Sequence, residues 1–281
     1  MDMSGRILLF LMAISCIACH QSMQSLQTII PNPQPSLSDN DNIAILQPYD
    51  TSDIPNSYIV GRISTPAKGI STINSITKIM HTYDSIAQKN GANIIRFLNV
   101  NYGRTSKEPD RATAVLYRVP DIRKYEKRIV WTSKRKLTWE DFKGKIPDTL
   151  LRNYNYSSYA SIGIQHRSNA AFLVGSGNFF VLSTFDCSRS WYRPYAYFQT
   201  NFLEFQQGLF DLTELYARKM RQELASKNVK DKNTFTQNVD KTLSKQYKEA
   251  QTQFVQATKG GSDAEALKEW HEKIWAELAK M

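Results

Sequence analysis

Apolar side chains recur at steps of three and four along residues 70–92, in a chain of 281 residues. The repeating positions are Ile70, Ile73, Ile76, Met80, Tyr83 and Ala87. This spacing predicts an amphipathic helix with one face against a core. Ser71 or Thr72 is suited to cap the start of the helix, and Gly91 follows its end, where a residue of left-handed conformation is favoured.

Short runs rich in aliphatic and aromatic residues surround this helix. They cover residues 42–49, 57–63, 92–103 and 111–119, and their composition predicts β-strands. Residues 43–120 are therefore expected to form a small α/β module in which a helix is combined with strands in a strand-helix-strand-strand arrangement.

The remainder of the chain, residues 125–281, predicts a second domain. Residues 129–132, 159–167 and 178–188 have the composition of strands, and residues 198–225, 238–257 and 264–281 that of helices. Thr138 is placed to cap a short helical turn that Gly144 and Pro147 end. Helices and strands in separate groups indicate an α+β fold.

In the first of these three helices, packing against a core is enough to explain the pattern of apolar residues. Its apolar stripe consists of Phe202, Phe205, Leu209, Leu212, Tyr216, Met220 and Leu224. Phe205 and Leu209 are four residues apart, so both side chains project from one face toward a core.

The N-terminal residues predict export. Arg6 precedes an apolar run over residues 7–18, which is too short for a permanent span and typical of a secretory signal peptide in residues 1–18. The end of this run resembles a bacterial lipobox. That resemblance implies lipidation at Cys19, with Cys16 as the alternative, and an ordinary cleaved signal or an uncleaved anchor stays open. Residues 19–42, polar and rich in proline, are expected to form a flexible tether.

After cleavage before Cys19, Cys187 and the lipidated residue are the remaining cysteines, so no disulfide between free thiols is expected. The formal net charge is +10, and the exported part keeps it because Asp2 and Arg6 leave together. For an exported chain such a charge favours lipid headgroups, acidic proteins or anionic polysaccharide, and we expect no nucleic-acid partner.

Four segments in residues 125–281 resemble those of a secreted bacterial family of unassigned function whose members are predicted to be zinc-dependent proteases. They are LTWEDFKG at 137–144, FQQGLFDLTE with YARKMR at 205–221, FVQATKGG at 254–261 and EALKEWHEKI at 265–274. The family has "HEqGHFDIaE" in the second segment and "YDxeTxHG" in the third. The resemblance implies a zincin-like mixed sheet with long C-terminal helices.

Carried across position by position, the two helical histidines of the family correspond to Phe205 and Leu209, its glutamate to Gln206 and its late histidine to Gly260. A zinc protease needs two imidazoles at this spacing and a carboxylate to take a proton from the bound water. The resemblance therefore implies a pseudo-metalloprotease with no metal, no cofactor and no catalytic residues at these positions. In the family Asp211 could support the site; here a cap, a hydrogen bond or solvent exposure is expected.

Other residues offer weaker candidates. His20 lies in the tether, His81 is expected to be half-buried and structural, and His166, His271 and Asp211 are the set from which a relocated metal site could be built. Residues 174–178 depart from a Gly-x-Ser-x-Gly elbow around Ser176, and Gly175 with Gly177 predicts a turn between strands. The aromatic residues of 191–205 are expected to be core, with sugar stacking as the alternative.

These observations together predict a lipoprotein of the Gram-negative envelope, in the outer membrane or facing the periplasm. A lipid anchor would hold it to the membrane, and its inactive domain would bind a protein or an envelope polymer. Two alternatives stay open. One is an active metal-dependent hydrolase with relocated ligands, and the other is a binding protein that acts through residues 43–120.

Overall fold

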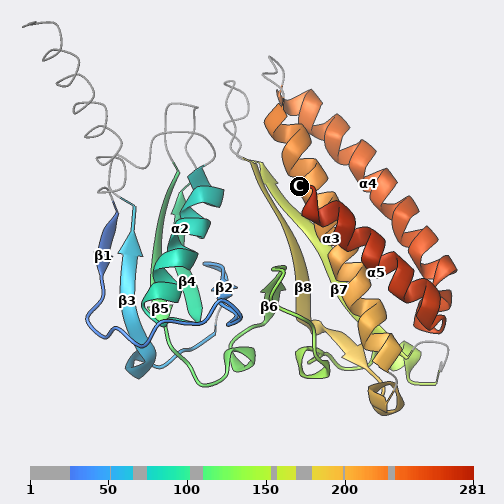
Figure 1. Ribbon diagram of the computed structural model, residues 1–281, viewed down its shortest axis with the longest axis horizontal. Helices are drawn as coiled ribbons and strands as arrows, with labels where there is room; N and C mark the ends of the chain where they lie inside the picture. The colour runs from blue at the N-terminus through green and yellow to red at the C-terminus, as the bar shows by residue number, and fades with distance from the viewer. Residues whose placement is uncertain are drawn as a thin grey trace, which may run out of the picture.

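The computed structural model describes residues 26–50, 52–65, 75–101, 110–152, 157–168, 179–198, 200–226 and 232–281. The fold is α+β and contains two separate sheets, one in each half of the chain (Figure 1). Among the described residues, no helix combines the length and apolar character needed to cross a bilayer.

The first sheet has five strands in the order β1-β3-β5-β4-β2. Its elements are β1 (Gln27–Ile29), β2 (Ala44–Leu46), β3 (Ile59–Ser64), α2 (Ser75–Lys89), β4 (Ile94–Asn101) and β5 (Arg111–Tyr117). The pair of β2 and β4 is parallel and the other pairs are antiparallel. The four strands predicted from residues 42–119 are confirmed, and β1 is an addition.

Helix α2 covers one face of this sheet with the predicted stripe. Of the predicted positions, Tyr83 and Ala87 are fully buried, and so is Ile79, which the prediction did not include. The Tyr83 ring stacks on Phe97 of β4 at a centroid distance of 5.7 Å. Gly91 has a φ of 71°, which confirms the predicted left-handed residue after the helix. Ser71 and Thr72 lie outside the described residues.

The prediction of a flexible tether over residues 19–42 is wrong for residues 26–42. Strand β1 pairs with β3, and the segment that follows donates backbone hydrogen bonds from Gln34 to Asn90 and from Leu37 to Gln88. The Leu37 side chain is buried in the hydrophobic core that α2 forms with the first sheet. A polar, proline-rich composition shows that a segment cannot form a core by itself, but it does not prevent the segment from pairing with a sheet that other residues have built.

The second sheet has three strands in the order β6-β8-β7, and three helices lie on one side of it (Figure 1). Its elements are β6 (Arg128–Val130), β7 (Ser158–Ser168), β8 (Phe179–Tyr192), α3 (Thr200–Ser226), α4 (Lys232–Ala257) and α5 (Ala264–Ala279). All its strand pairs are antiparallel. The mixed sheet that the resemblance predicted for residues 125–281 is therefore not observed, because β7 and β8 follow each other and pair antiparallel. The mixed sheet of this α+β fold is the five-stranded one in the first half.

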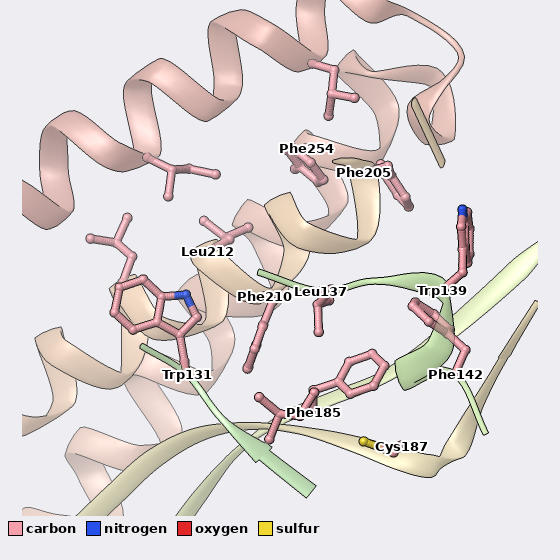
Figure 2. Close-up of a cluster of buried hydrophobic side chains, with 14 of the residues drawn as sticks. Trp131, Leu137, Trp139, Phe142, Phe185, Cys187, Phe205, Phe210, Leu212 and Phe254 are labelled. Atoms are coloured by element: carbon pink, nitrogen blue, oxygen red, sulfur yellow. The ribbon is translucent and has the colours of Figure 1, made fainter. Parts of the chain in front are cut away.

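A large aromatic core joins this sheet to the helices (Figure 2). Its buried members include Trp131, Trp139, Phe142, Phe185, Cys187, Phe205, Phe210 and Phe254. They come from the segment after β6, from β8, α3 and α4, and the same core also includes Ile129 of β6 and Leu267 of α5. Strands and helices of the second half therefore share one core.

The two halves meet where β2 lies beside β6 (Figure 1). Tyr49 donates a hydrogen bond to Gln165 at 3.2 Å, and Ser52 donates one to the Tyr125 carbonyl at 2.6 Å. Across this junction, one side of α2 and the sheet of the second half face each other over a cavity.

Candidate functional site

Helix α3 contains three of the four residues that the resemblance sets against a zinc motif, and we call Phe205, Gln206, Leu209 and Gly260 the substituted motif. Phe205 is 8% exposed and Leu209 is half-buried. Both contact the large aromatic core of the second half, as their spacing predicted. Gln206 is also buried. Gly260 lies in a short turn between α4 and α5 that folds back onto α3.

The ring of Phe205 is held on two sides. It stacks on Phe254 of α4 with centroids 5.2 Å apart and an interplanar angle of 12° (Figure 2). A Cβ on Gly261 would lie 2.7 Å from the Phe205 Cβ, so the turn passes directly against it. The contact with Phe205 is made by Gly261, whereas a Cβ on Gly260, the position that the resemblance sets against the last histidine, would meet nothing within 4 Å.

Gln206 points toward the second sheet. Its amide nitrogen donates a hydrogen bond to the Ser158 hydroxyl at 3.0 Å, at the start of β7. An amide does not titrate near neutral pH, so this side chain can orient its neighbours but cannot take up a proton as a general base.

Asp211 is the most heavily bonded side chain near the substituted motif. It is 1% exposed. Oδ1 accepts hydrogen bonds from Trp131 Nε1 at 2.7 Å and Gln207 Nε2 at 2.7 Å, and Oδ2 accepts one from Trp275 Nε1 at 2.9 Å. Of the three expected roles, hydrogen bonding is the one observed, and it links β6, α3 and α5.

The segment 137–144 docks on α3 through the same network. The side-chain Oε1 of Gln207 accepts a hydrogen bond from the Leu137 backbone N–H at 2.8 Å. The predicted cap at Thr138 is confirmed: its backbone N–H donates to the Asp141 carboxylate at 2.8 Å, at the start of the short helical turn Trp139–Asp141.

Arg135 joins two buried carboxylates beside this turn. Its guanidinium lies 2.9 Å from Glu126 and 2.6 Å from Asp141. Burial raises the pKa of Glu126, and the charge of Arg135 acts in the opposite direction. A paired, buried triad of this kind fixes the segment before α3. No local pattern in the sequence marks this triad, because the partners of Arg135 lie nine and six residues away without helical spacing.

The histidines are scattered. His81 lies on the surface of α2, so its predicted half-buried structural role is wrong, because its place on the helix is outside the apolar stripe. A ring nitrogen of His271 lies 3.0 Å from the Glu204 carbonyl oxygen. The backbone of His166 pairs with Val181, and its side chain is outside the described set. In the described part of the chain, no three His, Cys, Asp or Glu side chains gather as a metal site would need.

Several further candidates fall outside the described residues, namely Cys16, Cys19, His20, Gly175, Ser176 and Gly177. In the aromatic segment, Trp191 and Phe205 are buried, as expected for core residues, whereas Tyr195 is 39% exposed. Among the aromatic side chains of this segment that the structure describes, Tyr195 is the exposed one, and a single ring does not make a stacking platform.

The chain matches no model of a known protein family, no curated protein and no solved structure.

Proposed function

We propose that this protein acts by binding and not by catalysis. It would be an exported lipoprotein, anchored through Cys19 or alternatively Cys16, in the outer membrane or facing the periplasm of a Gram-negative bacterium. Its second half would be a pseudo-metalloprotease that holds a protein or an anionic polysaccharide without cutting it. The net charge of +10 supports an acidic partner.

The observation that supports this proposal is the packing of Phe205. A zinc site of this type needs a lone pair at positions 205 and 209, and a phenyl ring and an isobutyl group have none. Phe205 stacks on Phe254, with Gly261 against its Cβ. Apolar groups that pack at this place stabilise the fold without an ion and leave no unpaired imidazole.

Zinc content tests the proposal directly. The purified full chain is incubated with zinc, desalted and analysed, beside a variant with Phe205→His, Gln206→Glu, Leu209→His and Gly260→His. We expect no zinc retained by the unchanged chain and about one zinc per chain in the variant. The single change Phe205→His is the matched control, since it disturbs the same core without a second ligand.

About one zinc per unchanged chain, together with peptidase activity lost on chelation, would overturn the proposal in favour of a hydrolase with relocated ligands. In that case His166 and His271 are the first positions to change. Labelling with radioactive palmitate in Cys19→Ala and Cys16→Ala variants tests the anchor separately, because only the change at the lipidated cysteine abolishes labelling.

A further inference from the structure

Two arginines, Arg62 of β3 and Arg96 of β4, lie on the face of the first sheet that is opposite to α2. Both pair with Val115 of β5, the strand between them, so the three side chains point to the same side of the sheet. The residues on either side of Val115, Ala114 and Leu116, pack in the core that α2 forms with the sheet. The two arginines therefore point away from α2.

No carboxylate of the sheet offsets these two charges. The five strands, as the structure describes them, contain neither aspartate nor glutamate. Among the described residues, no ion pair joins Arg62 or Arg96 to a carboxylate, whereas Arg135, Arg218 and Arg221 all lie within 3.0 Å of one. A guanidinium group binds carboxylate and phosphate with paired hydrogen bonds. The arginine pair thus favours an anion from outside the sheet.

The surface around the arginine pair is exposed toward the edge of the sheet. At one end of this face, Ile94 and Tyr117 are buried in a small core of their own. Toward the other end Arg62 and Asn99 are exposed, and Ile29 of β1, which pairs with Arg62, is 67% exposed. Positive charge beside an exposed aliphatic side chain supplies both contributions to binding at a membrane interface, electrostatic attraction and apolar burial.

The spacing of the two arginines suits a surface with many separate anionic groups. One strand, β5, lies between β3 and β4. The backbones at Arg62 and Arg96 are therefore roughly 10 Å apart, two strand spacings. Each guanidinium can bind its own phosphate on such a surface.

The position of β1 limits how far this face can lie from the proposed lipid anchor. Strand β1 is the edge strand on the side of the first sheet away from the second half (Figure 1). Gln27 at its start is eight positions after Cys19 and eleven after Cys16. An extended chain spans at most about 3.6 Å per residue, so β1 lies within about 29 Å of a lipid at Cys19, or about 40 Å at Cys16. A short connection of this kind raises the effective concentration of headgroups at the sheet.

We propose that the face with Arg62 and Arg96 docks on the anionic phospholipid headgroups of the membrane that holds the anchor. The two guanidinium groups bind headgroup phosphates, and Ile29 enters the interfacial region beside them. The inference rests on the lipid anchor of the proposed function and adds to it the face that meets the membrane. It does not involve the substituted motif or the partner of the second half.

The test uses the full chain, isolated from membranes and reconstituted in vesicles of phosphatidylcholine alone or mixed with phosphatidylglycerol. A fluorophore is attached through Asn99→Cys, since Asn99 pairs with Thr113, two residues before Val115 on the same side of β5. Lipids with a nitroxide on the headgroup quench a fluorophore that is docked. We expect strong quenching with phosphatidylglycerol, weak quenching without it, and release at high salt.

Two controls define the background of this measurement. The chain without Asn99→Cys, labelled in the same way, corrects for other thiols, and Cys187 is buried. A fluorophore attached through Lys245→Cys reports on α4 in the second half, where the lysine side chain is 80% exposed. That fluorophore should not be quenched by either kind of vesicle.

Removing both charges should release the docked face. Each arginine near an anionic surface contributes about fivefold to binding, so Arg62→Gln with Arg96→Gln should lower the ratio of docked to undocked chains about 30-fold. Arg62→Gln alone, at the more exposed position, should lower it about fivefold. Arg152→Gln with Arg189→Gln is the matched control, since both side chains are exposed in the second half and the loss of charge is equal. Melting temperatures verify that each variant is folded.

Three outcomes would overturn the inference. Quenching at position 99 is the same with and without phosphatidylglycerol, or the control pair of arginines lowers docking as much as Arg62 and Arg96 do. In the third, soluble polygalacturonate or polyglutamate binds through Arg62 and Arg96 while anionic vesicles leave the fluorophore unquenched. An acylated chain that stays unquenched rejects the docking and keeps the anchor. A chain without an acyl group that anionic vesicles still quench rejects the anchor and supports the docking face.

Discussion

The ring of Phe205 on α3 lies flat against the ring of Phe254 on α4, with the centroids 5.2 Å apart. In the proposed resemblance to predicted zinc proteases, Phe205 stands at the position of a metal-binding histidine. Phe254 is fully buried and also meets Trp270 edge-on at 5.6 Å. The place that a metal site would occupy is thus a junction of three helices.

Truncating either ring of this pair should destabilise the fold. Phe205→Ala and Phe254→Ala should each lower the free energy of unfolding by about 3–5 kcal/mol, because a large buried side chain leaves a cavity. Denaturant titration measures the change. Val255→Ala is the control, since Val255 is adjacent and 40% exposed, and it should cost well under half as much; equal losses at 254 and 255 would contradict the packing described.

The neighbouring glycines 260 and 261 should differ sharply in their tolerance of a methyl group. Both have positive φ, 66° and 94°, so Gly260→Ala should cost about 1–2 kcal/mol in backbone strain alone. At Gly261 the new Cβ would also lie 2.7 Å from the Phe205 Cβ, whereas nothing lies within 4 Å of the one at Gly260. Melting temperatures of the two variants should therefore separate, with Gly261→Ala clearly lower.

Removing the Asp211 carboxylate should cost more than removing one of its donors. Asp211→Ala leaves two indole N–H groups and the Gln207 amide unpaired, at about 1–3 kcal/mol for each group that stays buried. Trp275→Phe removes one donor and keeps most of the ring, so its loss of stability should be the smaller one. Thermal unfolding measures both losses. If Trp275→Phe lowers the melting temperature as much as Asp211→Ala does, Asp211 is not the centre of the network.

Cys187 should be unreactive in the folded chain. Burial raises the pKa of its thiol to about 12, so at pH 8 the thiolate that reacts with iodoacetamide is scarce. Unfolding in guanidinium should restore labelling, and the difference between the chain and Cys187→Ala isolates this thiol from Cys16 and Cys19.

The same shift has a defined sign for stability. The folded thiol keeps its proton up to about pH 12, whereas an unfolded thiol loses it near its ordinary pKa, about 8.5. The unfolded state therefore binds fewer protons in that window, and stability falls as the pH rises through it. Cys187→Ala should show a weaker loss of stability at alkaline pH.

The amino-acid sequence by itself determined the local elements. The period of apolar residues defined α2 and α3, the strand composition defined β2 to β8, and Gly91 and Thr138 marked a helix end and a turn start, because these features depend on residues close together in the chain. The residue types at 205, 206, 209 and 260 are also read directly from the sequence; that they replace a zinc motif stays a prediction from the resemblance.

Tertiary structure alone decided the rest. Only folding placed residues 26–42 on the first sheet, Gly261 against Phe205, three donors around Asp211, and Tyr49 against Gln165. Apart from the bond between Gln207 and Asp211, these relationships join residues tens to more than a hundred positions apart. No short-range pattern encodes them, because they arise when whole sheets and helices pack and the polar groups at their junctions must find partners.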